Sequence, residues 1–597
     1  MLRTHTCGEL RSEQIGCEVS LCGWVDRVRD HKGVIFIDLR DRWGRTQVVV
    51  GPDANAATLA AARAARAEWV LRVTGAVGAR PEGTTNPKLA TGGIEVVCRS
   101  IEVLNEAETP VFQPGATELP GEEVRLAHRW LDLRRPAMQE NLFLRSRIVK
   151  IMRDHCDEFG FVDVETPMLG RSTPEGARDF LVPSRLDHGS FFALPQSPQL
   201  YKQLLMMAGF DRYVQVAKCF RDEDLRADRQ PEFTQLDVEM SFVEADDVMG
   251  VIEGLVRRTA REILGLDVPL PLPRLTWDEC MERFGHDAPD LRYGLEICDL
   301  TAIAGESDFR VFRGAAESGG RVRGIRVPGA AGQFSRKDLD DLTGLAVEGG
   351  AKGLVWLKVE PDGSWSGPVA KNIGAVAEAL KARLGCVPGD LALIVADSFE
   401  VTCKALHMLR KRLGAELKLY DPDAMHFSWV VDFPMFARDT ETGGWASMHH
   451  PFTAPRSADL ELLDRDPAAC RAVAYDLVIN GSEAGGGTIR IHDGATQEKV
   501  FKLLGISPEL ARERFGFLLD ALRSGAPPHG GIALGIDRWV MLFAKLDSIR
   551  DVIAFPKTQK ASDLMTGAPG GVDTKQLVEL GIRVVVPPKP EPPRPGA

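Results

Sequence analysis

The sequence predicts a multidomain protein that joins an all-β part to α/β parts. Its 597 residues exceed the roughly 250–300 residues at which a single hydrophobic core stops growing. Residues 1–108 are rich in short strands of alternating hydrophobicity, whereas residues 289–422 alternate strand-like and helix-like segments. These observations indicate several separate cores along one chain.

The N-terminal part, residues 1–108, is predicted to be an OB-fold barrel. One helix is expected in the alanine-rich segment 54–69. Five or so strands around one helix at that place fit the OB-fold. The alternating apolar residues place the strands within residues 18–30, 33–50, 69–80 and 92–104.

A polar linker or hinge, residues 109–135, is expected to follow the barrel. An amphipathic helical pattern begins near its end at Leu126, stops at Gly160 and leads into a short strand with Pro167. The remaining chain is predicted to comprise a domain in two parts, 136–288 and 423–560, an inserted α/β module, 289–422, and a C-terminal extension, 561–597, with a disordered proline-rich end.

Composition excludes several classes of protein. A hydrophobic fraction of 44% and a charged fraction of 26% are typical of soluble globular chains. The net charge of -12 argues against a histone-like, nonspecific nucleic-acid binder, although a local basic patch would suffice for specific binding. No apolar run is long enough to span a bilayer and the start lacks an apolar signal core, so we expect a cytoplasmic protein. The 11 cysteines contain no C-x-x-C pair, so neither zinc nor a disulfide framework is expected.

The most informative segment, residues 220–242, reads as two antiparallel strands joined by a charged loop. In its second strand the apolar residues alternate with Gln235, Asp237 and Glu239, which places carboxylates on the face of a cavity. Arg221 and Glu223 are expected in the phase of the first strand. Such groups are costly on a sheet face unless a charged ligand or metal pairs with them, which a merely solvated hairpin would not supply.

Three further segments carry candidate ligand-binding residues. Ser197 and Pro198 resemble a helix start, with Gln199 and Lys202 on one face of the helix. In residues 474–493, Asp476 and Glu483 suit Mg²⁺ and flank the glycine run 485–487, which alone would read as a surface turn. Arg538 lies in the first turn of a helix after a glycine-rich strand, where a cation opposes the helix dipole unless an anion such as ATP phosphate binds.

The order and the amino-acid sequences of these segments resemble the motifs of class II aminoacyl-tRNA synthetases. Within that class they resemble the bacterial aspartyl-tRNA synthetases. The segment around Pro167 resembles motif 1, a dimer-interface element, residues 220–242 resemble motif 2, and GIALGIDR at 531–538 resembles motif 3. The resemblance covers nearly the whole chain. It implies a catalytic domain on an antiparallel sheet flanked by helices, the bacterial-type insertion at 289–422, and a homodimer.

The resemblance also implies the reaction and its residues. Aspartate and ATP form aspartyl-adenylate and diphosphate, and the 3′ hydroxyl of the tRNA then takes the aspartyl group. Positioning and charge stabilisation carry this chemistry. Arg221, Glu223 and Arg538 are the implied catalytic residues. ATP is expected to contact Arg221, Asp222, Glu223, Gln230, Glu483, Gly535, Ile536, Asp537 and Arg538, with Mg²⁺ on Asp476 and Glu483.

The aspartate pocket is implied in the same way. Arg490 and Lys202 are expected to receive the side-chain carboxylate, since an arginine fork binds a carboxylate bidentately and would reject the amide of asparagine. The whole expected set is Glu175, on a loop that closes over the substrate, with Ser197, Gln199, Lys202, Asp237, His449 and Arg490.

The barrel is expected to bind the tRNA anticodon through Arg29, His31, Phe36, Gln47, Gly83 and Glu95. Phe36 is a candidate base-stacking platform, although its place in VIFID also fits a core residue. By resemblance, His31 and Gly83 match enzymes of relaxed specificity that charge both tRNA-Asp and tRNA-Asn, and a partner amidotransferase would then convert Asp-tRNA-Asn. A solvated His31 without a role in tRNA choice is the alternative.

Three other functions are weighed against this hypothesis. A strict tRNA-Asp enzyme differs only in tRNA choice. A non-catalytic paralogue that regulates would tend to lose the motif arginines or the barrel, and aspartate-driven ATP–diphosphate exchange without tRNA would exclude it. An ammonia-dependent asparagine synthetase of similar fold would lack the anticodon barrel, which residues 1–108 are predicted to form.

Overall fold

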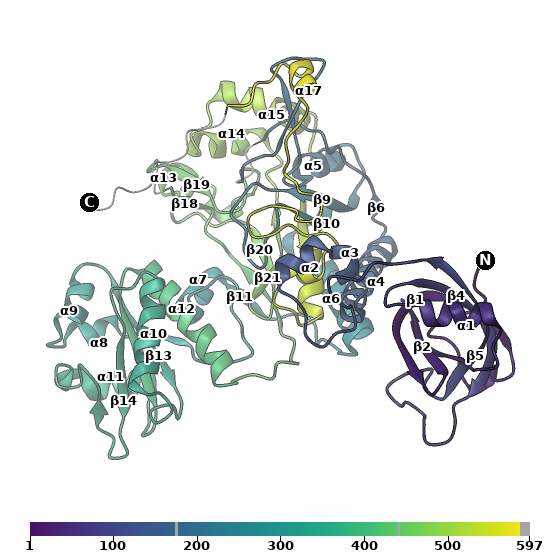
Figure 1. The fold of residues 1–597 in the computed structure, drawn as a ribbon. Helices are drawn as coiled ribbons and strands as arrows, with labels where there is room; N and C mark the ends of the chain where they lie inside the picture. The colour runs from purple at the N-terminus through teal and green to yellow at the C-terminus, as the bar shows by residue number, and fades with distance from the viewer. Residues whose placement is uncertain (174–176, 440–441, 586–597) are drawn as a thin grey trace. The chain divides into compact units, whose positions relative to one another are not determined.

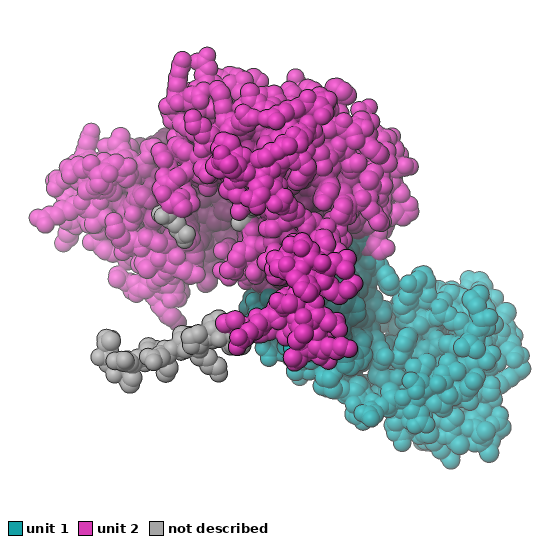
Figure 2. Space-filling view, turned by 90° about the horizontal axis from the view of Figure 1, so that it is seen from above, with its two compact units in different colours: residues 1–145, 550–571 teal, residues 146–549, 572–597 magenta. Residues whose placement is uncertain are grey.

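The computed structural model describes residues 1–173, 177–439 and 442–585, and Figure 1 follows them from the purple N-terminus to the yellow C-terminal part. They group into two compact units, which Figure 2 draws in teal and magenta: Met1–Arg145 with Arg550–Gly571, and Ser146–Ile549 with Val572–Ala597. Glu175 and residues 586–597 of the predicted disordered end lie outside the described residues. Within the described ranges, no helix is long and apolar enough to cross a bilayer.

The predicted OB-fold is confirmed, because five strands of the first unit close a barrel in the order β1-β2-β3-β5-β4. The apolar phase of each strand fills the barrel, and Leu21, Ile37 and Leu71 are completely buried there. Helix α1 (Ala56–Ala64) lies in the predicted alanine-rich segment and is capped by Asn55, whose side chain accepts the N–H of Thr58. The strands are β1 (Glu18–His31), β2 (Val34–Asp41), β3 (Gly44–Val50), β4 (Val70–Ala79) and β5 (Ile94–Asn105).

Two short helices, α2 (Glu122–Ala127) and α3 (Arg129–Asp132), occupy the second half of the predicted linker. The buried Arg129 side chain explains this order, since it bonds Asp132 and donates to the carbonyl oxygens of Arg550, Ile553 and Ala554. The helical pattern expected from Leu126 is therefore broken before Pro136, where α4 (Pro136–Glu158) begins. Proline disfavours a helical residue before it and suits the first helical position.

The second unit is built on an eight-stranded sheet in the order β11-β17-β20-β21-β22-β10-β9-β6. Its strands run antiparallel except for the two edge pairs, β11 with β17 and β6 with β9. This agrees with the antiparallel catalytic sheet implied by the family resemblance. The strands are β6 (Val162–Asp163), β9 (Arg212–Phe220), β10 (Glu232–Ser241), β11 (Arg274–Thr276), β17 (Phe427–Val431), β20 (Ala474–Ile479), β21 (Ser482–Ile489) and β22 (His529–Gly535).

The predicted hairpin at 220–242 is confirmed, with Phe220 opposite Glu232 and Gln215 opposite Asp237. One detail of the prediction is wrong. Arg221 and Glu223 do not share the phase of β9, because that strand ends at Phe220 and both residues lie in the loop beyond it. A loop frees their side chains from the alternation of the sheet, so they can turn toward a ligand.

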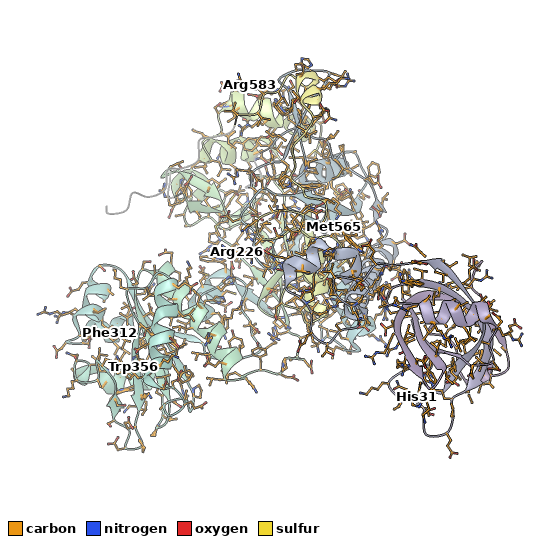
Figure 3. The ribbon with its side chains drawn as sticks, in the orientation of Figure 1. His31, Arg226, Phe312, Trp356, Met565 and Arg583 are labelled. Atoms are coloured by element: carbon orange, nitrogen blue, oxygen red, sulfur yellow. The ribbon has the colours of Figure 1, made fainter. Side chains whose placement is uncertain are left out.

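A separate five-stranded antiparallel sheet, with the order β12-β13-β16-β14-β15, lies within the predicted inserted module. Helices pack on its strands, and Figure 3 labels two of its aromatic residues, Phe312 and Trp356. Its elements are β12 (Ile297–Asp299), α8 (Thr301–Gly305), α9 (Arg310–Glu317), β13 (Arg321–Val327), α10 (Arg336–Glu348), β14 (Val355–Val359), β15 (Trp365–Ser366), α11 (Ala377–Leu384), β16 (Leu391–Asp397) and α12 (Phe399–Glu416).

The other elements of the second unit surround the eight-stranded sheet. Helix α5 matters most for the site, because it packs against β9 and β10, beside which Figure 1 draws it. The full set is β7 (Leu181–Pro183), β8 (Phe191–Ala193), α5 (Gln199–Met207), α6 (Ala245–Leu264), α7 (Trp277–Phe284), β18 (Phe436–Arg438), β19 (Trp445–Ser447), α13 (Leu462–Arg465), α14 (Gly494–Leu503), α15 (Pro508–Arg523), α16 (Ile536–Phe543) and α17 (Thr574–Glu579).

Candidate active site

A cavity of about 220 Å³ opens beyond the ends of β9 and β10 and is bounded by β21, β22 and the start of α16. Asp222 and Ile536 do not line it: the Asp222 carboxylate lies 3.6 Å from Arg178, and the Ile536 side chain is buried. Most of the residues predicted to bind ATP do line it, namely Arg221, Glu223, Gln230, Glu483, Gly535, Asp537 and Arg538.

Two arginines of the cavity lie among its acidic residues, Glu223, Asp228, Glu483 and Asp537. The Arg221 guanidinium lies 5.0 Å from the ring centre of Phe233, which orients it by a cation–π contact. Arg538, in the first turn of α16, lies 3.0 Å from the Asp228 carboxylate and 3.8 Å from that of Glu483. Because a cation is unfavourable at a helix N-terminus, these carboxylates stabilise Arg538 where a phosphate could take their place.

Asp476 and Glu483 approach each other over Gly486. A Cβ built on Gly486 would lie 2.9 Å from Asp476 Oδ1 and 3.5 Å from Glu483 Oε1, so a side chain there would displace the Asp476 carboxylate. The surrounding walls of the cavity, and next the charge of Asp476, raise the pKa of Glu483. Asp476 Oδ1 is buried and accepts no hydrogen bond from the described residues. Two crowded carboxylates with a free oxygen fit a hard divalent cation such as Mg²⁺.

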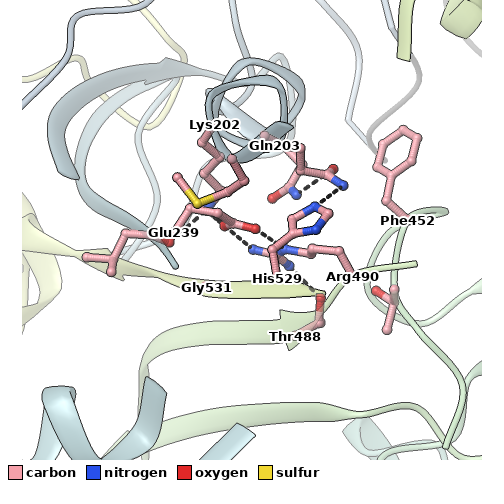
Figure 4. Close-up of polar contacts among 12 residues, drawn as sticks. Lys202, Gln203, Glu239, Phe452, Thr488, Arg490, His529 and Gly531 are labelled. Atoms are coloured by element: carbon pink, nitrogen blue, oxygen red, sulfur yellow. Dashed lines mark hydrogen bonds and ion pairs between the residues drawn. The ribbon is translucent and has the colours of Figure 1, made fainter. Parts of the chain in front are cut away.

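A second group of charged side chains is buried between α5, β10 and β21 (Figure 4). Arg490 donates from Nε and Nη2 to the two carboxylate oxygens of Glu239, each at 2.9 Å. Lys202 Nζ lies 3.0 Å from Asp237 Oδ1 and 3.3 Å from Glu239 Oε2. Gly531 of β22 admits Glu239, since a Cβ there would lie 2.2 Å from Oε2. This set, Lys202, Asp237, Glu239 and Arg490, is called the buried charge cluster below.

The pKa values of the two acids in the buried charge cluster are shifted in opposite directions. Burial alone would raise the pKa of Glu239, but Arg490 and Lys202 outweigh it and hold that pKa at about 2. Burial raises the pKa of Asp237, and Lys202 offsets only part of the effect. Asp237 Oδ2 also has no hydrogen-bond partner among the described residues. A buried carboxylate oxygen without a donor fits a ligand that brings N–H groups.

Two adjacent histidines contact different charged residues, Asp476 and Arg490. His449, which was predicted for the aspartate pocket, has Nε2 3.6 Å from Asp476 Oδ1. His450 contacts Arg490 instead and accepts a hydrogen bond from Nη1 at 2.8 Å through Nε2. Burial, and next the charge of Arg490, lower the pKa of His450 well below its usual value, which suits this acceptor role.

The helix start at α5 differs by one residue from the prediction. Pro198 occupies the N-cap position and Gln199 begins the helix, so Ser197 is not the cap and Pro198 is not the first helical residue. The Ser197 hydroxyl still accepts the N–H of Gln199, at 3.3 Å. The predicted face is confirmed, because Gln199 and Lys202 are both buried on α5.

Comparison with known proteins identifies the family. A family model described as tRNA synthetases class II (D, K and N) matches residues 121–559, and one described as an OB-fold nucleic acid binding domain matches residues 19–104. The chain is a class II tRNA synthetase of the D, K and N family. The synthetase therefore carries the cavity at the start of α16 and the buried charge cluster on the sheet of this class.

Curated relatives resemble the synthetase over its full length. The "Aspartate--tRNA(Asp/Asn) ligase" of Rhodopirellula baltica is 62% identical over 98% of this chain and 99% of its own. The "Aspartate--tRNA ligase" of Bacillus licheniformis is 52% identical over 98% of each chain. The solved structure of asparaginyl-tRNA synthetase from Pyrococcus horikoshii, complexed with asparaginyl-adenylate, covers 94% of this chain and 99% of its own, with a TM-score of 0.58 and 20% identity, and so supports the fold.

Four of the predicted anticodon residues meet on one face of the synthetase's barrel. Arg29 lies 5.9 Å from the ring centre of Phe36 and donates to Gln47 at 3.2 Å. Gln47 donates in turn to Glu95 at 2.8 Å. Phe36 is half-buried, so its ring is not wholly a core residue.

The two residues predicted to set tRNA specificity lie at exposed turns of the barrel. His31 is exposed at the end of β1 and is labelled in Figure 3. Gly83 has a φ of +78°, and a Cβ built on it would meet no atom within 4 Å. The structure links neither residue to Arg29 or Gln47 by a hydrogen bond.

Sequence reasoning gave no role to Glu239, His450, Gln203 or His529, all of which surround Arg490 or Lys202. A signal for Glu239 was present, since it shares the strand phase of Asp237. His450 is the neighbour of the predicted His449, and only the path of the chain after β19 decides which ring faces Arg490.

Proposed function

We propose that the synthetase joins L-aspartate to tRNA, and that it charges tRNA-Asn as well as tRNA-Asp. The observation that carries the first part is the buried charge cluster, whose Arg490 and Lys202 match an acidic amino acid. Relatives at 52–62% identity bear the names aspartate–tRNA(Asp/Asn) ligase or aspartate–tRNA ligase. His31 and Gly83 support the second part.

In this proposal the side-chain carboxylate of aspartate binds Arg490 and Lys202. Four hydrogen bonds use four of the five N–H groups of Arg490, which leaves one Nη2 N–H for the substrate. Asp237 Oδ2 receives the ammonium together with Ser197 and Gln199. Asparagine would present N–H groups to these donors, and a mismatch of this kind can lower kcat/KM by about 10⁴-fold.

ATP occupies the cavity between the hairpin loop and α16. An oxygen of the aspartate α-carboxylate attacks the α-phosphorus, the bond to the β-phosphate oxygen breaks, and diphosphate leaves. Arg221 stabilises the charge on the α-phosphate and Arg538 the charge at the γ-phosphate, while Glu223 and Gln230 position the nucleotide. His449, with Nε2 3.6 Å from Asp476 Oδ1, is proposed to contact aspartate, as the family resemblance implies.

Asp476 and Glu483 would hold Mg²⁺, which when bound neutralises phosphate charge and lowers the barrier to displacement. In the second step the 3′ hydroxyl of tRNA attacks the aspartyl carbonyl and AMP leaves. Glu175, Asp222 and Ile536 are proposed to contact aspartate or ATP as the family resemblance implies.

The tRNA partner contacts the barrel through Arg29, Phe36, Gln47 and Glu95. Phe36 stacks on an anticodon base, and the polar residues beside it read base edges. We further propose a homodimer, as is usual in this class, and a functional link to an amidotransferase that converts Asp-tRNA-Asn.

Side-by-side aspartylation of tRNA-Asp and tRNA-Asn transcripts tests the proposal, with the H31L variant included. Similar charging of both, with selective loss of tRNA-Asn charging in H31L, is expected. Charging of tRNA-Asp alone would refute the relaxed specificity and favour a strict tRNA-Asp ligase. Failure to charge either tRNA with aspartate would refute the proposed function itself.

A further inference from the structure

Three buried polar side chains form a hydrogen-bonded chain beside the buried charge cluster. Gln199 Nε2 and Gln203 Oε1 are 2.9 Å apart, and Gln203 Nε2 and His529 Nε2 are 3.2 Å apart. His529 Nδ1 lies 2.8 Å from the carbonyl oxygen of Pro527. Gln203 and His529 are at most 1% exposed, and Figure 4 shows them facing each other above Arg490.

The hydrogen bond between His529 and the Pro527 carbonyl fixes which atom donates in each of the other two hydrogen bonds. The Pro527 carbonyl can only accept, so His529 must carry its proton on Nδ1. Burial lowers the pKa of His529, which keeps the ring neutral and makes Nε2 an acceptor. Gln203 must then turn its amide nitrogen to His529 and its oxygen to Gln199. Gln199 can satisfy that oxygen only with its own nitrogen.

These directions determine which atom of Gln199 remains available for a ligand. With Nε2 committed to Gln203, Gln199 has Oε1 left for a ligand, and this oxygen has no hydrogen-bond partner among the residues the structure describes. Gln199 lies on the face of α5 that also carries Lys202. An oxygen there attracts an ammonium group, whereas an amide nitrogen would repel it.

We propose that Gln203 and His529 are positioning residues that orient Gln199 as an acceptor for the ammonium group of the amino-acid substrate. The inference rests on the proposed function, since it assigns the ammonium of aspartate to Gln199. The polarity is set by the Pro527 carbonyl and transmitted through two side chains that touch no substrate. The hydrogen-bonded series Gln199–Gln203–His529 thus favours binding of an amino acid over binding of a dicarboxylate that lacks an amine.

Two variants of Gln203 separate this role from packing. Q203M keeps the volume and removes both hydrogen bonds, so Gln199 can turn either way. Q203E can only accept, so Gln199 must still donate Nε2, while His529 becomes protonated and pairs with the new carboxylate. The measurements are aspartate-driven ATP–diphosphate exchange, with KM for aspartate and ATP and kcat, and the inhibition constant of succinate, which has both carboxylates and no amine.

In Q203M we expect KM for aspartate to rise about tenfold, as for a lost hydrogen bond to a charged group, with KM for ATP and the succinate constant changed by less than about twofold. In Q203E we expect aspartate to bind more tightly than in Q203M. A succinate constant that rises as much as KM for aspartate in Q203M would overturn the proposal, even if Q203E does not fold. Weaker aspartate binding in folded Q203E than in Q203M would also overturn it. Absence of aspartate-driven exchange in the wild type would instead refute the proposed function.

Discussion

Removing the negative charge of Glu239 should destabilise the second unit strongly. The E239Q substitution keeps the shape of the side chain but replaces one of the two oxygens that Arg490 contacts at 2.9 Å. It also leaves Lys202 with Asp237 as its remaining carboxylate. Because Arg490 is only 2% exposed, water would solvate its unpaired charge poorly.

Two estimates of the loss in unfolding free energy agree. The arginine and lysine hold the pKa of Glu239 at about 2 against an ordinary value of 4.5, which corresponds to about 3 kcal/mol. Breaking a buried ion pair by removing one partner costs about 3–5 kcal/mol. Since the pKa is depressed on folding, this stabilisation is present above the ordinary pKa and is lost as the pH falls toward 2.

The matched control is E262Q, because Glu262 accepts from Arg258 at the same 2.9 Å but is 41% exposed. Urea unfolding should show a midpoint decrease for E239Q that corresponds to about 3–5 kcal/mol at unchanged slope. For E262Q the change should stay below about 1 kcal/mol. The double variant E239L/R490M should regain part of the loss, because it leaves no unpaired charge. Equal midpoints for E239Q and E262Q, or a double variant less stable than E239Q, would refute the reasoning.

The remaining predictions concern the ATP cavity and the barrel. R538K should raise KM for ATP about tenfold in the exchange assay, since an ammonium cannot reproduce the guanidinium fork; an equal rise in KM for aspartate would contradict a role confined to ATP. Lowering the pH should raise the Mg²⁺ concentration needed for half-maximal exchange. The reason is that the pKa of Glu483 is raised, so this residue takes up a proton at a higher pH than an ordinary glutamate. The E483Q variant should lose this pH dependence. G486A should raise the same Mg²⁺ requirement at constant pH, because its Cβ would lie 2.9 Å from Asp476 Oδ1, and an unchanged requirement would contradict the site. F36L should weaken tRNA binding by about 1–3 kcal/mol in a filter assay and leave exchange unchanged, whereas unaltered binding would make Phe36 a core residue only.

The alternation of apolar and polar residues predicted most of the strands, because a strand's period of two is visible in sequence. It predicted the barrel, the β9–β10 hairpin and the place of Asp237 on the polar face of β10. It failed at element ends. Arg221 was assigned to a strand that stops at Phe220, and the α5 cap was misplaced by one residue, since capping depends on a few local dihedral angles that periodicity does not encode.

The sequence by itself determined the family, the order of the motifs and the kinds of charged group that the site contains, since these depend on residue identity and spacing. Only the tertiary structure decided which groups pair. Glu239 rather than Asp237 takes the arginine fork, and His450 rather than His449 contacts Arg490. The reason is that β10, β21 and α5 are far apart in sequence, and hydrogen bonds form only between atoms that the folded sheet brings within about 3 Å. The Gln199–Gln203–His529 hydrogen bonds likewise depend on the fold, because Gln203 and His529 are 326 residues apart in sequence, whereas the contact of His529 with the Pro527 carbonyl is local.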